Sequence, residues 1–170
     1  LAKKPESYEI CFIPDNDYRS FLKKRVEGIE EKLNDGLFVN TEGKILGKHR
    51  GYPFYTIGQR KGLEVALGDP AYVVEIKPDT NTVVLGSYDE LKKQEMWVKN
   101  VNLIKYTSLD NATEALTRIR YKDKGTNSTI EQIGDRVKVT FHNSVTAVAP
   151  GQSAVFYDGD DVIGGGFIER

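Results

Sequence analysis

The residue with the clearest chemical potential is Cys11, the only cysteine of the chain, in the stretch Glu9-Ile10-Cys11-Phe12-Ile13-Pro14. A thiolate can act as a nucleophile or carry sulfur, but a free cysteine of pKa ~8.5 is only a few per cent ionised at neutral pH. A lone cysteine among apolar neighbours is more commonly a buried core residue, which is the alternative interpretation. One cysteine excludes an internal disulfide and predicts a reducing compartment, by default the cytosol.

Positive charge gathers between Glu42 and Glu64, a stretch without any acidic residue. Its cations are Lys44, Lys48, Arg50, Arg60 and Lys61, with His49 among them, and its aromatic residues are Tyr52, Phe54 and Tyr55. Basic side chains that reach phosphates, beside rings able to stack on bases, are what RNA binding requires. The alternative is a solvated loop whose aromatic residues belong to the core.

A second acid-free stretch runs from Val137 to Tyr157. It follows a group of cations, namely Arg118, Arg120, Lys122 and Lys124. On alternate positions of a strand, Arg118, Arg120 and Lys122 would share one face. That face is either a stripe that follows phosphates or the solvated side of a sheet.

Several kinds of site are not predicted. The sequence contains no P-loop, no dinucleotide-binding glycine pattern and no hydrolase elbow, and it has too few Cys and His residues for a metal site. Gly164-Gly165-Gly166 falls inside a predicted strand, which favours close backbone packing or a bulge over a phosphate loop. No run approaches the ~20 apolar residues that cross a bilayer. The net charge of −1 alone predicts neither nucleic-acid nor membrane binding.

The apolar pattern predicts a chain that is mainly β with one or two short helices. Asp15 or Asp17 can cap a helix with apolar residues at 18, 21, 22 and 26. Turns at 40–43 and 78–81 predict two hairpins, 37–39 with 44–46 and 71–76 with 82–85. The later predicted strands are 97–103, 116–121, 129–133, 136–141, 153–156 and 162–168, a spacing typical of a small closed β-barrel. We place a domain boundary near Gln94.

Further segments share a family pattern with the Cys11 stretch. They are Gly47-Lys48-His49-Arg50-Gly51, Tyr55-Thr56-Ile57-Gly58-Gln59-Arg60-Lys61-Gly62-Leu63, Arg120-Tyr121, and Pro150-Gly151-Gln152-Ser153-Ala154-Val155-Phe156-Tyr157 with Gly164-Gly165-Gly166. In this order and spacing, the chain resembles the C-terminal portion of the tRNA-specific 2-thiouridylases, the MnmA/TrmU family. The resemblance implies that 1–14 is the remnant of a missing ATP pyrophosphatase domain, and that 15–94 is a small central α+β domain. It also implies that 95–170 is an antiparallel β-barrel similar to domain 2 of elongation factors.

The resemblance implies a chemistry as well. Enzymes of this family adenylate the C2 oxygen of the wobble uridine in tRNAs for Lys, Glu and Gln, and then replace that oxygen with sulfur from a cysteine persulfide. Cys11 matches the persulfide cysteine, and Arg120, Tyr121 and Gln152 match positions that contact tRNA. Further candidates for tRNA binding are Lys48, His49, Arg50, Arg60 and Lys61.

The implied partners are tRNA and a sulfur-carrier protein that donates the persulfide, with no membrane partner and no metal site in this chain. ATP with magnesium is expected only in the full-length enzyme, so the chain alone is expected to be inactive. The SGGVDSS-type phosphate loop and the first catalytic cysteine of the family are absent. Tyr8 stands where many members have glutamine, and Ser128-Thr129 occupies a region that often holds a cysteine. A stand-alone RNA-binding module without catalysis remains the alternative, and the coding sequence upstream would decide between the two.

Overall fold

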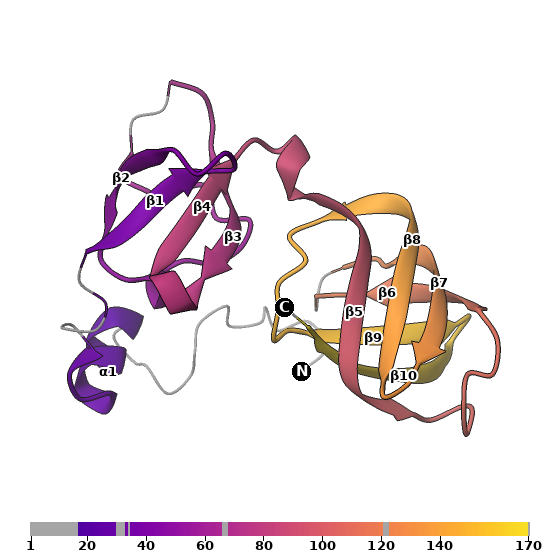
Figure 1. Cartoon of the computed structure of the whole chain (residues 1–170). Coiled ribbons are helices and arrows are strands. Elements are labelled where there is room, and N and C mark those ends of the chain that lie inside the picture. Colours follow the sequence, from indigo (N-terminus) through magenta and orange to yellow (C-terminus); the bar gives the residue numbers. More distant parts are fainter. Residues whose placement is uncertain (1–16, 30–32, 34, 66–67, 121–122, 170) are drawn as a thin grey trace, which may run out of the picture.

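The computed structural model describes residues 17–29, 33, 35–65, 68–120 and 123–169. These residues form a four-stranded sheet and a closed barrel, which Figure 1 shows as two bodies joined by a short connection. We call residues 36–86 the sheet unit and residues 92–168 the barrel. The expectation of a mainly β chain with an antiparallel β-barrel is confirmed.

The first described element is the helix α1 (Tyr18–Arg25). Asp17 caps it, because its carboxylate accepts the backbone N–H of Ser20 at 3.0 Å. Three cations, Lys23, Lys24 and Arg25, fall in the last turn, where they meet the negative end of the helix dipole. The helix predicted near Asp17 is confirmed.

The sheet unit has the strand order β2-β1-β4-β3. Its strands are β1 (Gly36–Asn40), β2 (Ile45–His49), β3 (Tyr72–Lys77) and β4 (Thr82–Gly86). The two predicted hairpins are present as the antiparallel pairs β1–β2 and β3–β4, and the parallel pair β1–β4 joins them. Phe38, Val73 and Leu85 form the core of this unit, and Tyr55 and Leu63 from the long β2–β3 connection pack against it.

The barrel closes in the order β10-β5-β8-β7-β6-β9, and each neighbouring pair is antiparallel. Its strands are β5 (Lys92–Leu103), β6 (Thr113–Arg118), β7 (Thr126–Ile133), β8 (Arg136–Thr146), β9 (Ser153–Asp158) and β10 (Asp161–Ile168). The strands alternate between the core and the outer face: on β8, Val137, Val139 and Phe141 are buried, whereas Thr140 is exposed.

The three glycines of β10 allow its two neighbours to approach closely. A Cβ on Gly164 would lie 2.5 Å from the Asn102 carbonyl oxygen of β5, and one on Gly165 would lie 2.5 Å from the Ala154 carbonyl oxygen of β9. The register of β10 also shifts against both neighbours, as at a bulge. The prediction of close packing or a bulge is therefore confirmed.

For the strand predicted at 116–121, the predicted C-terminal end is wrong, because β6 ends at Arg118. The Ile119 backbone N–H donates to the Asp123 carboxylate at 3.2 Å and makes no bond within the sheet ladder. The other oxygen of Asp123 accepts the Gly125 N–H at 3.1 Å. An Asp side chain that bonds nearby backbone in this way favours a turn over a continued strand.

The connection between the two bodies is attached to the sheet unit. It contains the short 3-10 helix η3 (Asp89–Leu91), in which Leu91 is buried. The Glu90 carboxylate accepts hydrogen bonds from Thr41 Oγ1 at 2.6 Å, Ser87 N at 2.7 Å and Ser87 Oγ at 2.9 Å. Because Thr41 lies in the β1–β2 turn, these bonds fix the connection to the sheet unit immediately before β5 begins.

Candidate nucleic-acid interface

Arg120 lies in the loop between β6 and β7, which the Asp123 carboxylate organises. Its side chain is exposed, and its Nη2 donates to the Thr146 carbonyl oxygen at 3.2 Å. This bond holds the guanidinium of an exposed side chain at the end of β8. A positioned, exposed guanidinium is suited to a phosphate, which can accept two parallel hydrogen bonds from it. Tyr121 lies outside the described residues.

Gln152 lies in the β8–β9 connection and lines a pocket together with residues of the sheet unit. Its backbone is held on both sides: its N–H donates to the Ala149 carbonyl at 3.2 Å, and its own carbonyl accepts the Ile168 N–H at 2.8 Å. The side chain is exposed at a pocket of about 240 Å³ whose other walls include Tyr52, Ile57 and Pro150. An amide at this position can offer both a donor and an acceptor to a ligand.

The basic residues of the β2–β3 region have different surroundings. Lys48 is exposed but paired, with its Nζ 2.7 Å from Asp35 Oδ1. This pairing lowers the pKa of Asp35 through a hydrogen bond and charge attraction. Arg50, Arg60 and Lys61 are exposed, and none of them has an ion pair within the described part of the chain. They are the cations of this region that phosphate could meet without displacing a carboxylate.

His49 differs from its basic neighbours because its side chain is only 6% exposed. The ring packs edge-on against Phe38 and Tyr55, with centroid separations of 4.9 and 5.2 Å, and its Nδ1 accepts the Gly51 N–H at 3.0 Å. Burial lowers the pKa of His49, and the backbone carbonyls of Leu37 and Asn81 offset part of that effect. His49 was predicted as a tRNA-binding candidate, but the structure places its ring in the core of the sheet unit.

One contact brings the two basic regions toward each other. Ala147 follows Thr146, the residue that holds Arg120, and it lies against Gly58 in the β2–β3 connection. Arg60 and Lys61 lie two and three positions after Gly58 in that connection. Cations distant in the sequence therefore lie on either side of one joint between the barrel and the sheet unit.

Cys11, the predicted persulfide carrier, lies outside the described residues. Within residues 17–29, 33, 35–65, 68–120 and 123–169, no group of three or more His, Cys, Asp or Glu side chains is arranged to hold a metal ion. In the same residues, no helix has the length and apolarity needed to cross a membrane.

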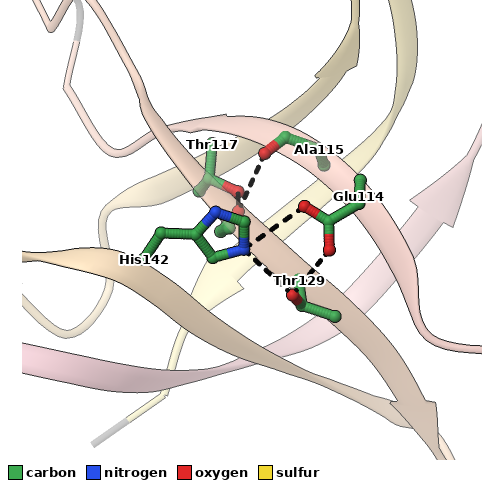
Figure 2. A network of polar contacts seen from close by, with 6 residues as sticks. Glu114, Ala115, Thr117, Thr129 and His142 are labelled. Carbon is green, nitrogen blue, oxygen red and sulfur yellow. Dashed lines mark hydrogen bonds and ion pairs between the residues drawn. The ribbon is translucent and has the colours of Figure 1, made fainter.

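Figure 2 shows a polar network on the outer face of the barrel that the sequence analysis missed. Thr129 Oγ1 donates to Glu114 at 2.9 Å, and His142 Nε2 lies 3.1 Å from Thr129 Oγ1 and 3.2 Å from Glu114. The three residues resemble a nucleophile, a base and an acid, but one ring nitrogen serves both partners. Because the Thr129 proton is already directed to Glu114, His142 is not placed to remove it. The network therefore links β6, β7 and β8 and is not a catalytic triad. Alternation along each strand predicts that these side chains face outward, but the pairing register cannot be read from the sequence.

Comparison with known proteins gives consistent matches along the chain. Residues 19–87 match the family model described as the tRNA methyl transferase PRC-barrel domain, and residues 93–168 match the one described as the Aminomethyltransferase beta-barrel domain. A tRNA-specific 2-thiouridylase MnmA of Cytophaga hutchinsonii is 55% identical over 170 residues, which are 99% of this chain and 46% of that protein. Proteins of the same name from Amoebophilus asiaticus and Salinibacter ruber are 55% and 50% identical, and the matches cover 99% and 100% of this chain and 45% of each relative. The chain thus spans about half the length of the curated relatives it matches.

Proposed function

Because the chain belongs to the tRNA-specific 2-thiouridylase family, we propose that it is the C-terminal part of an enzyme that thiolates the wobble uridine of tRNA at C2 in an ATP-dependent reaction. In this proposal the chain supplies the persulfide cysteine, Cys11, and a docking surface for tRNAs of the Lys, Glu and Gln type. A sulfur-carrier protein in the cytosol delivers the sulfur. The full-length enzyme is a tRNA-uridine 2-sulfurtransferase, and the chain alone is inactive.

We also propose a division into 1–14, the end of a nucleotide-binding domain, 15–94, a central domain, and 95–170, the barrel domain. The end of the sheet unit at Gly86 and the start of β5 at Lys92 support a boundary in this region. The packing of β10 supports placing the ATP site elsewhere: its glycines are the only run of consecutive glycines among the described residues, and atoms of the neighbouring strands lie 2.5 Å from where their Cβ atoms would be. In this proposal, the ATP site belongs to the part of the relatives that this chain does not cover.

The sulfur step depends on a thiolate. Cys11 Sγ as a thiolate attacks the outer sulfur of the donor persulfide, the donor sulfur–sulfur bond breaks, and the donor leaves as its own thiolate. Cys11 then carries the transferable sulfur. An alcohol forms no equivalent persulfide, so Cys11→Ser in the full-length enzyme abolishes 2-thiouridine formation while tRNA binding persists. A variant that keeps even a tenth of the wild-type thiolation would show that Cys11 is a core residue and does not carry the sulfur.

The observation that carries the docking proposal is the placement of Arg120. Its guanidinium is exposed, held by Thr146 and close to the Gly58–Ala147 joint that leads to Arg60 and Lys61. A tRNA backbone that lies along this joint would meet cations from both units, and the side-chain amide of Gln152 would add a neutral contact from the rim of the pocket. Lys48 and Arg50 extend the same basic region.

Arg120→Ala tests the docking surface. In this chain we expect weaker binding of an unmodified tRNA transcript and a salt dependence shallower by roughly one counterion, as for a lost phosphate contact. Arg136→Ala is the control, because it removes the same side chain from the barrel at a place already paired with Glu169. Circular dichroism must show both variants folded. Wild-type affinity of Arg120→Ala at both low and physiological salt would remove the barrel from the docking surface.

A further inference from the structure

The outer face of the barrel carries two arginines that stack on aromatic rings. The guanidinium carbon of Arg118 lies 4.7 Å from the ring centroid of Tyr157, and that of Arg136 lies 4.7 Å from the Trp97 ring. Tyr157 belongs to β9 and Arg118 to the neighbouring strand β6, so the contact joins two paired strands. Stacking occupies the face of a guanidinium and leaves the N–H donors along its edge available.

The two stacks differ in charge. Arg136 Nη1 lies 3.1 Å from Glu169 Oε2, so its charge is compensated. Within the described part of the chain, Arg118 has no carboxylate partner within ion-pair distance. Asp158 follows Tyr157 directly, but its Oδ2 lies 2.7 Å from Lys105 Nζ, which lowers the pKa of Asp158. The Arg118 stack therefore presents an uncompensated positive charge.

Arg118 also lies beside the docking residue proposed above. Thr117 and Ile119 are buried, whereas Arg118 and Arg120 are exposed, so the alternation of β6 persists past the end of the strand. Only Ile119 lies between Arg118 and Arg120, which keeps their Cα atoms within about 7 Å. The two guanidiniums thus extend one positive surface from the joint onto the barrel wall. Beyond Tyr157, the carboxylates of Asp158 and Asp161 at the β9–β10 turn pair with Lys105.

We propose that Arg118, held by the Tyr157 ring, is a further tRNA contact that binds a backbone phosphate next to the one bound by Arg120. The proposal rests on the proposed function, since it extends the same docking surface. The ring reduces the freedom that the guanidinium loses on binding, and the absence of a carboxylate means that no ion pair must break. Arg136 meets only the first of these two conditions, so the proposal does not extend to the Trp97 stack.

The test measures binding of an unmodified tRNA transcript with a wobble uridine to the whole chain over a series of salt concentrations. Arg118→Ala should weaken binding roughly fivefold at physiological salt and reduce the salt slope by about one counterion. Arg118→Lys should keep the salt slope of the wild type but only part of its affinity, because the charge remains while the planar stack on Tyr157 is lost. Tyr157→Leu should likewise keep the slope and weaken binding about two- to threefold.

Arg136→Ala is the matched control and should bind tRNA like the wild type. Arg120→Ala tests the docking surface itself, so comparing it with Arg118→Ala separates a failure of this proposal from a failure of the proposed function. Wild-type binding by Arg118→Ala together with weakened binding by Arg120→Ala would overturn the Arg118 contact and leave the docking surface in place. Equal losses in Arg118→Ala and Arg136→Ala would also overturn it, because the effect would then be one of total charge. If the wild-type chain binds no tRNA, both proposals fail.

Discussion

Gly58 of the sheet unit lies against Ala147 of the barrel so closely that a Cβ on Gly58 would be 2.9 Å from the Cβ of Ala147. The Gly58 N–H donates to the Val73 carbonyl at 2.8 Å, so this part of the loop is fixed to β3. Both residues have positive φ, 88° at Gly58 and 56° at Ala147. The joint between the two bodies is therefore set by backbone conformation as well as by side-chain packing.

Gly58→Ala should separate the barrel from the sheet unit and weaken tRNA binding, because the added methyl group meets Ala147. The matched control is Gly43→Ala, at φ 87° in the β1–β2 turn with no atom within 4 Å of the added Cβ. Each substitution places an alanine in a left-handed conformation, which costs about 1–2 kcal/mol of folding stability. The additional loss of stability in Gly58→Ala therefore measures the clash with Ala147. Thermal unfolding and small-angle scattering check this. Equal losses of stability and unchanged scattering would show that the contact does not hold the units together.

Local patterns in the sequence predicted most of the fold. Asp17 before Phe21 and Leu22 predicts a capped helix, and the two turns of the sheet unit predict its hairpins, since each signal involves neighbouring residues. The parallel pairing of β1 with β4 was not predicted, because it joins strands that a long connection separates. The end of β6 was predicted too late, because the Asp123 side chain competes with the ladder for the Ile119 N–H.

The surroundings of the candidate site were harder to predict. The run Lys48-His49-Arg50 has the composition of an RNA-binding loop. His49, however, is the final residue of β2, and its ring faces the core and packs against Phe38. The Gly58–Ala147 contact depends on how two bodies meet, and no periodicity encodes that. Alternation placed Arg118 and Arg120 on one face, but the ring under Arg118 comes from β9 and follows only from the barrel register.

Glu90 should be a stability determinant of the connection, because its carboxylate accepts three hydrogen bonds. The bonds from Thr41 and Ser87 lower the pKa of Glu90. Glu90→Ala should cost roughly 1 kcal/mol, or about 2–4 °C in Tm, and should speed exchange of the Ser87 amide proton. Glu75→Ala is the control, since Glu75 is exposed and makes only a long ion pair, with its Oε2 3.6 Å from Lys77 Nζ. Unchanged exchange at Ser87 would contradict this role.

Thr117 and Ser128 form a buried hydroxyl pair inside the barrel, with their oxygens 2.7 Å apart and both side chains 0% exposed. Ser128 Oγ also bonds the Ala115 carbonyl at 3.2 Å. Ser128→Ala should destabilise the fold by about 1–3 kcal/mol, because it leaves the Thr117 hydroxyl buried without its partner. The double variant with Thr117→Val should lose less than the sum of the two single changes. Additive losses in denaturant unfolding would show that the pair is not coupled.

Stability should fall as the pH drops below about 6.5, and His49 should be the main cause among the two histidines of the chain. Burial lowers the pKa of His49 in the folded state, so the unfolded chain binds a proton first as the pH falls. The contribution of His49 to stability is therefore complete above the unfolded pKa and is lost progressively below it. Protonation also removes the Nδ1 lone pair that accepts the Gly51 N–H.

His49→Phe should flatten this decline, measured as the free energy of unfolding at several pH values between about 5 and 8. The overall stability of the variant should also be lower, because the buried Gly51 N–H loses its acceptor. His142→Gln is the control: His142 is on the exposed face of the barrel, and the variant should keep the decline seen in the wild type. If His49→Phe declines with pH as steeply as the wild type, His49 does not control the acid sensitivity.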